Sequence, residues 1–199
     1  MITGILGGGQ LARMLALAGH PLGVRSICID PAADACAFDV AQGLCGAYDD
    51  PALLDRLAAE SDVVTFEFEN VPASSGEQLA KRLPVYPQAN ALSMKQDRLT
   101  EKRLFERLGI ATTPFCAVSS AAELDEAVER LGLPLVLKTR SDGYDGKGQF
   151  LLHEDDDRAE VLAGFKGAPL IAERFIHFDR EVSLIAVRGQ GGEMAYYDI

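Results

Sequence analysis

Residues 2–14 read ITGILGGGQLARM, which is a short apolar run, three consecutive glycines and the start of an amphipathic segment. A buried strand that enters a tight turn and continues as a helix has this pattern. Four residues at helical spacing are expected to form the apolar face of that helix: Leu11, Met14, Leu15 and Ala18. The run from Val24 to Ile29 reads as the next strand, so the segment predicts a parallel βαβ unit.

The alternation of strands and helices continues through the first hundred residues. Asp49-Asp50-Pro51 is typical of a helix N-terminus, and Val63 to Phe66 is the next apolar strand. Two sequences of the capping-box type, Ser75-x-x-Gln78 and Ser93-x-x-Gln96, predict the starts of two further helices. Residues 1–100 are therefore predicted to form an open parallel α/β sheet of the Rossmann type.

The pattern changes after Pro114, where Ser120-x-x-Glu123 predicts the start of a helix between short strands. The strands of this second domain are expected at 115–118, 135–138, 149–152, 170–173 and 181–187. The sequence finishes on the strand-like run Met194-Ala195-Tyr196-Tyr197 with no closing helix, so we expect it to be the front part of a longer protein.

The composition narrows the classes of partner. Nineteen basic and 30 acidic residues give a formal charge of −11, which disfavours binding to nucleic acid or to an anionic membrane. No apolar run approaches the roughly 20 residues of a membrane span. The four cysteines form no Cys-x-x-Cys pair and the three histidines are scattered, so neither a zinc site nor a disulfide framework is expected. A reducing cytoplasm is the predicted location.

The glycine turn is the first candidate site. Gly7-x-Gly9-x-x-Ala12 lies between a strand and a helix, and Asp30 follows the second strand, as in a dinucleotide-binding fingerprint. Backbone amides at such a turn attract any phosphate or carboxylate. An NAD-dependent oxidoreductase that uses Gly7, Gly9 and Asp30 is therefore one reading, and a tight turn without a ligand is another.

The second candidate site is the stretch LVLKTRSDGYDGKGQ, residues 135–149. Lys138 is at the end of a predicted strand, and Lys147 lies in a glycine-rich loop that leads to the next strand. Lysine side chains and loop amides can together hold phosphate groups. The loop lacks the Walker sequence, so it predicts a different kind of phosphate site, with a solvated hairpin as the alternative.

Several charged residues stand at the ends of predicted elements. Glu67 and Glu69 follow the strand that ends at Phe66, where open α/β sheets place their ligands, although capping or solvated carboxylates would give the same pattern. Glu173 and Glu181 flank the last predicted strands. Arg98 lies on the helix between the domains, where it could reach a phosphate or pair with neighbouring acidic residues.

Taken together, these motifs resemble the ATP-grasp superfamily and, within it, the 5-(carboxyamino)imidazole ribonucleotide synthase family. The resemblance is carried by residues 7–14, 65–71, 97–102, 143–149 and 181–183. It implies a pre-ATP-grasp domain over 1–100 and the first part of an ATP-grasp domain over 101–199, with a lid at about 112–178. The C-terminal part of the ATP-grasp fold is expected to be absent, which would leave this chain alone inactive or severely impaired.

The family's reaction gives the expected substrates. ATP and bicarbonate form carboxyphosphate, and the amine of aminoimidazole ribonucleotide takes up the carboxyl group in purine biosynthesis. Mg²⁺ as a cofactor and a homodimer are also implied. Another ATP-grasp ligase, such as a formate-dependent glycinamide ribonucleotide transformylase or biotin carboxylase, is the nearest rival, and Gln10 with Tyr144-Asp145 favours the first reading over both. A nucleotide-binding fragment without catalysis is a further alternative.

The resemblance also implies roles for individual residues. Those expected to bind ATP are Arg98, Lys138, Gly143, Tyr144, Asp145, Gly146, Lys147, Gly148, Gln149, Glu173, Arg174, Phe175, Ile176 and Glu181. Those expected to face bicarbonate and the imidazole nucleotide as catalytic residues are Tyr144, Asp145, Lys147, Glu67 and Glu69. Those expected to bind substrate at the first turn are Gly8, Gly9, Gln10 and Leu11. The metal ligands are expected beyond Ile199.

Overall fold

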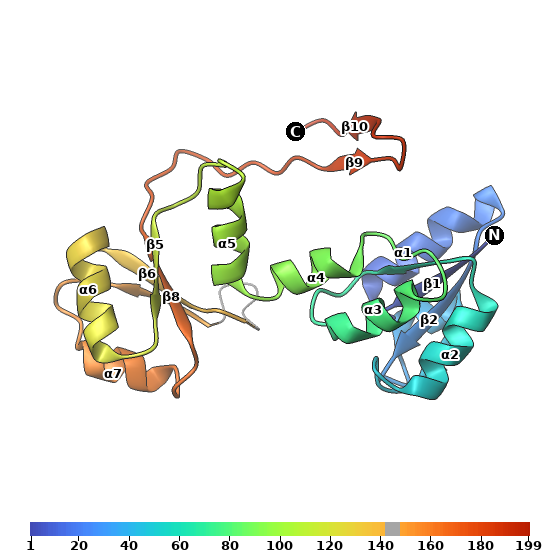
Figure 1. Ribbon diagram of the computed structural model, residues 1–199, viewed down its shortest axis with the longest axis horizontal. Helices are drawn as coiled ribbons and strands as arrows, with labels where there is room; N and C mark the ends of the chain where they lie inside the picture. Colours follow the sequence, from blue (N-terminus) through green and yellow to red (C-terminus); the bar gives the residue numbers. More distant parts are fainter. Residues whose placement is uncertain (142–147) are drawn as a thin grey trace.

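The computed structural model describes residues 1–141 and 148–199, which form two lobes joined by a helical connection (Figure 1). The N-terminal lobe contains a four-stranded parallel sheet in the order β3-β2-β1-β4. Its strands are β1 (Ile2–Leu6), β2 (Arg25–Asp30), β3 (Gln42–Cys45) and β4 (Val63–Phe66). The parallel α/β sheet expected for the first hundred residues is confirmed, and β3 is a strand that the sequence pattern did not predict.

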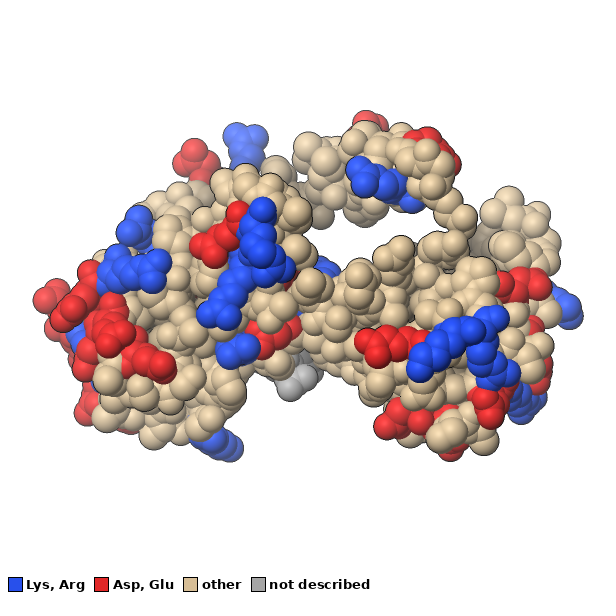
Figure 2. Space-filling view, in the orientation of Figure 1, with Lys and Arg blue, Asp and Glu red and all other residues tan. Residues whose placement is uncertain are grey.

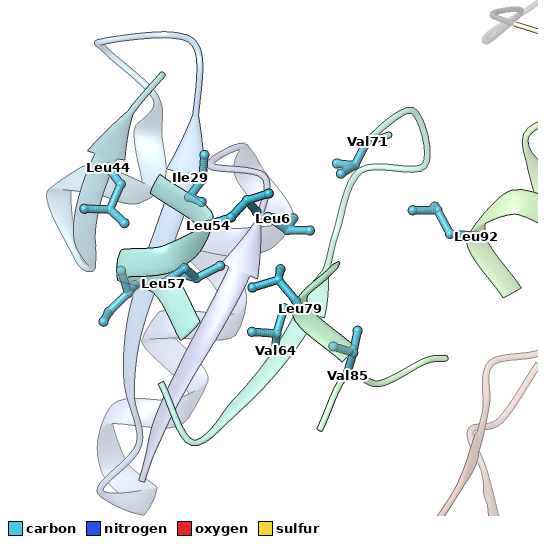
Figure 3. Packing of buried hydrophobic residues seen from close by; sticks show 11 residues of the cluster. Leu6, Ile29, Leu44, Leu54, Leu57, Val64, Val71, Leu79, Val85 and Leu92 are labelled. Carbon is cyan, nitrogen blue, oxygen red and sulfur yellow. The ribbon is translucent and has the colours of Figure 1, made fainter. Parts of the chain in front are cut away.

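Helices cover both faces of this sheet. One face carries α1 (Gln10–Gly19) and the short 3-10 helices η1 (His20–Leu22) and η2 (Cys36–Asp39), and the other carries α2 (Pro51–Glu60) and α3 (Ala73–Ala80). Successive side chains of a strand point to opposite faces. Leu6 therefore belongs to the main cluster under α2 and α3 (Figure 3). Ile5 belongs to the smaller cluster under α1.

The buried face of α1 differs from the one expected. Leu11, Met14 and Leu15 are 56%, 56% and 49% exposed, whereas Ala12 and Ala16 are fully buried. Small side chains allow the helix backbone to approach β2 closely. The stripe formed by Leu11, Met14 and Leu15 is therefore solvent-exposed in this structure, and the prediction of a buried leucine face is wrong.

Two helices connect the lobes, α4 (Ala89–Lys95) and α5 (Arg98–Arg107). Both serine caps expected in this region are wrong. Ser75 lies inside α3, and Ser93 lies inside α4 with its hydroxyl bonded to Asn90 O. The side chain of Asp97 caps α5 instead, because it accepts hydrogen bonds from two free amides of the first turn. In place of the helix predicted to start at Ser93, the structure has the two helices α4 and α5.

The C-terminal lobe is built on a four-stranded antiparallel sheet in the order β5-β8-β6-β7. Its strands are β5 (Phe115–Val118), β6 (Leu135–Thr139), β7 (Gln149–Leu152) and β8 (Leu170–Arg174). One face packs against α6 (Ala121–Leu131) and α7 (Arg158–Gly164) around a second hydrophobic cluster. The predicted cap of α6 is confirmed, because the Ser120 hydroxyl accepts a hydrogen bond from the Glu123 amide.

The last residues form a two-stranded antiparallel hairpin of β9 (Ala186–Arg188) and β10 (Met194–Tyr196), which stands apart from both larger sheets (Figure 1). The strand predicted at 181–187 is therefore mostly wrong, since residues 181–185 have no regular structure and are exposed. Val182, Leu184 and Ile185 lack the apolar cover that would hold them in a sheet. No helix within the described part of the chain is long and apolar enough to cross a membrane.

The exposed stripe of α1 yields a test in two substitutions. Leu15→Glu is expected to change the free energy of unfolding by less than about 0.5 kcal/mol, because the side chain is on the surface. Ala16→Leu, one residue further, is expected to cost about 1–3 kcal/mol through overpacking. Urea-induced unfolding measures both. A larger loss for Leu15→Glu than for Ala16→Leu would show that the leucine face is the buried one.

Candidate functional site

The glycine turn after β1 is filled by carboxylates of the protein itself. Gly8 N–H donates to Asp30 Oδ2 at 2.8 Å, and Gly9 N–H donates to Glu67 Oε1 at 2.9 Å. A Cβ atom added at Gly7, where φ is +117°, would lie 2.5 Å from Glu67 Oε1. A Cβ atom at Gly8 would lie 2.8 Å from Asp30 Cβ. The close approach of two carboxylates is a sufficient reason for glycine at both positions.

The carboxylate of Asp30 has further hydrogen-bond partners around this turn. It also accepts hydrogen bonds from the Tyr48 hydroxyl and the Ala32 amide, each at 2.9 Å. Burial and the hydrogen bond to Asp30 raise the pKa of Tyr48 above its ordinary value, so Tyr48 stays a hydrogen-bond donor. A carboxylate with these partners is not presented to a ribose, and the turn amides are not presented to a pyrophosphate. The arrangement disfavours the NAD-dependent reading.

The other predicted residues of this lobe are placed differently. Glu67 is half-buried against the turn, whereas Glu69 is exposed, because β4 ends at Phe66 and the strand alternation stops there. Gln10 and Leu11 are exposed at the start of α1. The structure therefore brings Gly8, Gly9 and Glu67 together and leaves Glu69 outside the group.

Cys28 lies below this turn and is fully buried. Burial, followed by the negative charges of Glu67 and Asp30, raises the pKa of its thiol to about 12. A thiol with such a pKa stays protonated near neutral pH and is a poor nucleophile.

The second group of predicted residues lies on the face of the C-terminal sheet that does not contact α6. In the register of the sheet, Lys138 is opposite Gln149 on β7 and Ile171 on β8, and Glu173 is opposite Phe115 on β5. Residues directly opposite one another share a face of the sheet. The core residues Leu135, Leu137 and Ala172 alternate with them onto the other face.

Glu173 is the buried charge at the centre of this group. Its Oε2 atom is 2.9 Å from Lys138 Nζ, and its Oε1 atom is 3.2 Å from Lys102 Nζ. The Glu173 side chain is 9% exposed and that of Lys102 is 14% exposed. A buried carboxylate needs such partners, since desolvation otherwise favours its neutral form. Two ammonium groups around one carboxylate leave a net positive charge on this face of the sheet.

Helix α5 is fastened to the end of β6 by a set of polar contacts. Arg98 N–H donates to Arg140 O at 2.9 Å, and Arg98 Nη1 donates to Thr139 O at 2.7 Å. Arg140 Nε donates to Asp97 Oδ2 at 2.9 Å.

Figure 2 shows basic side chains gathered over α5 and acidic ones over α6. A pocket of about 470 Å³ is lined by Asp97, Thr139, Arg140, Ser141, Gly148, Ala168 and Pro169.

The polar contacts between α5 and the end of β6 determine the charge state of Asp97. Burial raises the pKa of this carboxyl, but the hydrogen bond from Arg140, the amides of Thr100 and Leu99 and the charge of Arg140 outweigh burial. The pKa therefore lies below its ordinary value, and Asp97 is ionised at neutral pH.

The remaining predicted residues lie at the edge of this group or outside it. The side chain of Arg174 points to the core side of the sheet, where Nε donates to Leu131 O at 3.1 Å. Phe175 makes an edge-to-face contact with His177 beyond the strand, and Ile176 and Glu181 are exposed. Gly143, Tyr144, Asp145, Gly146 and Lys147 lie outside the described residues.

Sequence reasoning assigned no role to Tyr48, Lys102 or Arg140, although each takes part in one of the two groups. The spacing of Arg98 and Lys102, four residues apart on one helix, is the signal that could have placed both on one side of α5. Asp97 directly before the helix is a second signal, because aspartate is a preferred N-cap. Tyr48 carried no sequence signal.

The described residues contain no cluster of three or more His, Cys, Asp or Glu side chains that could hold a metal ion.

Two family models match the chain. Residues 1–96 match the ribonucleotide synthetase preATP-grasp domain, and residues 103–199 match the ATP-grasp domain. The parallel sheet followed by the antiparallel sheet has the order of these two domains. The chain therefore belongs to the ATP-grasp superfamily, and the class of protein is defined by both fold and sequence.

Individual relatives indicate which family within the superfamily the chain is similar to. N5-carboxyaminoimidazole ribonucleotide synthase of Pseudomonas aeruginosa is 48% identical over 199 residues, which are 100% of this chain and 55% of the relative. The crystal structure of the synthetase from Thermus thermophilus is 49% identical with a TM-score of 0.90, covering 99% of this chain and 53% of that chain. A structure from Aspergillus clavatus in complex with ADP and 5-aminoimidazole ribonucleotide is 29% identical with a TM-score of 0.87, covering 98% and 52%.

The chain is thus a member of the N5-carboxyaminoimidazole ribonucleotide synthase family. It spans about half the length of the relatives that it matches.

The ion pair between Asp97 and Arg140 yields a pH-dependent test. Asp97→Asn keeps a side chain that can cap α5 and removes only the charge, so a loss of about 1–2 kcal/mol in the free energy of unfolding is expected at pH 7. Because the pKa of Asp97 is lowered in the folded state, its contribution is full above the ordinary value of 3.8 and is lost as the pH falls through the lowered value.

Unfolding by urea at pH 7 and at pH 3 measures this difference. Asp125→Asn is the matched control, because the ion pair of Asp125 with Arg158 is on the surface and is expected to contribute little. A difference between Asp97→Asn and the unsubstituted chain that is equal at both pH values would refute the assigned role of the ion pair.

Proposed function

We propose that this chain takes part in the ATP-dependent carboxylation of 5-aminoimidazole ribonucleotide with bicarbonate, which yields N5-carboxyaminoimidazole ribonucleotide for purine biosynthesis. The observation that carries the proposal is the polar face of the C-terminal sheet, where Lys138, Gln149 and the buried Glu173 lie together in a chain of this family. Lysine at the end of a strand beside a glycine-rich segment suits the phosphates of a nucleotide.

In the proposed reaction, the γ-phosphoryl group of ATP passes to an oxygen of bicarbonate and ADP leaves. The amine of the ribonucleotide then attacks the carbon of carboxyphosphate, inorganic phosphate leaves with the C–O bond electrons, and the nitrogen loses a proton. Phosphoryl transfer of this kind depends mainly on positioning and on compensation of negative charge. Lys138 and Arg98 are the described cations that we assign to the phosphates of ATP.

The segment after β8 is assigned to the base and sugar of the nucleotide. Phe175 and Ile176 follow Glu173 closely in the chain and offer backbone groups and apolar surface next to the polar face. Arg174 contributes its backbone, since its side chain is bound to Leu131 O. The catalytic roles of Tyr144, Asp145, Lys147, Glu67 and Glu69, and the nucleotide contact of Glu181, stay predictions.

The first lobe is assigned to the imidazole ribonucleotide. Glu67 lies at the carboxyl end of the parallel sheet, which is where open α/β sheets bind ligands. Direct substrate binding by Gly8 and Gly9, whose amides are bonded to Asp30 and Glu67, stays a prediction. The domain boundary at residue 100, a lid at 112–178, a homodimer, a cytoplasmic location and Mg²⁺ bound with ATP also stay predictions.

Ligand binding tests the proposal directly, because the relatives are almost twice as long and binding needs less of the protein than turnover. MgATP at 100 times its dissociation constant is expected to stabilise the chain by about 2.7 kcal/mol, and NAD is expected to have no effect. Lys138→Met is expected to weaken ATP binding at least tenfold, since the variant loses a phosphate contact. Thermal unfolding with each ligand and calorimetric titration with ATP measure these effects.

Lys81→Met is the matched control, because Lys81 is an exposed lysine at the end of α3, in the other lobe. Stabilisation by NAD without stabilisation by ATP would refute the proposal. Equal ATP affinity of Lys138→Met and Lys81→Met would remove Lys138 from the site.

A further inference from the structure

Lys102 lies beside the proposed nucleotide site without an assigned role. It is one turn after Arg98 on α5, and its ammonium group reaches Glu173 Oε1 at 3.2 Å. The same group donates to Thr112 Oγ1 at 3.2 Å and lies 5.7 Å from the ring centre of Phe115. Contacts with three neighbours therefore hold this lysine in place.

The two lysines on Glu173 differ in how firmly they are held. Lys102 has the carboxylate, the Thr112 hydroxyl and the Phe115 ring around it, and its side chain is 14% exposed. Lys138 is 28% exposed and is opposite Gln149, with Glu173 as the ion-pair partner found among the described residues. Lys138 is therefore the lysine that can turn to another anion.

The negative charge of Glu173 opposes a movement of the Lys138 ammonium group toward another anion. If Lys138 leaves for a phosphate group, it leaves behind a buried carboxylate that must keep a compensating charge. Lys102 supplies that charge on the other oxygen atom, so Glu173 stays paired while Lys138 changes partner. Without Lys102, the carboxylate would have Lys138 alone and would hold it more strongly.

We propose that Lys102 is a positioning residue for ATP binding, which neutralises Glu173 and thereby frees Lys138 for the phosphates. This inference rests on the proposed function, because it needs ATP at the polar face. It deepens that function by adding a residue that acts through Glu173 and Lys138 and need not touch the nucleotide.

A double-mutant cycle on the 199-residue chain separates this role from a merely structural one. Lys102→Met is expected to raise the Kd for MgATP at least tenfold, measured by calorimetric titration. In a Glu173→Gln background the same substitution is expected to change the Kd less than twofold, because no carboxylate then retains Lys138. Lys102→Arg keeps the charge and is expected to stay within about threefold of the unsubstituted chain.

Lys95→Met is the matched control, because Lys95 is 68% exposed and pairs with Glu101 at the surface. Its Kd for MgATP is expected to equal that of the unsubstituted chain. Circular dichroism and urea unfolding report whether each variant is folded under the conditions of the titration. Should Lys102→Met fail to fold, Lys102→Gln, which keeps hydrogen-bonding groups and loses the charge, carries the same expectation.

The outcomes distinguish this inference from the proposed function. Binding of ATP by the unsubstituted chain with an unchanged Kd in the folded Lys102 variant overturns the role of Lys102 and leaves the proposed function in place. An equal loss of affinity in both Glu173 backgrounds also overturns it. If neither the unsubstituted chain nor Lys95→Met binds ATP, both proposals are overturned together.

Discussion

Glu173 brings a negative charge into a part of the C-terminal lobe from which water is largely excluded, and the arrangement around it follows from the need to compensate that charge. One lysine comes from α5 and the other from β6, so the helix that leaves the first lobe is bound to the sheet of the second. The contacts of Arg98 and Asp97 with the end of β6 act in the same place. The position of α5 is thus fixed by charges more than by apolar packing, in keeping with its single buried side chain, Leu99.

In the N-terminal lobe, two carboxylates are likewise held by contacts with the protein itself. Asp30 and Glu67 each accept a hydrogen bond from a glycine amide, which gives the turn a defined shape. The same observation explains why a dinucleotide fingerprint in a sequence does not establish a dinucleotide site. The glycines follow from the close approach of backbone to acidic side chains, and that approach is compatible with more than one ligand.

Much of the fold could be predicted from local patterns, and the failures have identifiable causes. Strands 63–66, 115–118 and 149–152 were predicted with the observed bounds, because short apolar runs between turn residues determine them. The buried face of α1 was not predictable from hydrophobicity, since close packing selected Ala12 and Ala16 over larger neighbours. In the site, Lys138 and Glu173 could be named from the sequence, whereas the contact of Lys102 with Glu173 depends on how α5 crosses the sheet.

Alternate residues of strand β8 face two different environments. Ile171 and Glu173 face the polar side, and Leu170, Ala172 and the Arg174 side chain face the core under α6. Inserting or deleting one residue in this strand would send the carboxylate into the hydrophobic cluster and an aliphatic side chain toward the two lysines. The spacing of residues along β8 is therefore constrained on both sides at once, so changes of length here are far less tolerable than conservative exchanges on either side.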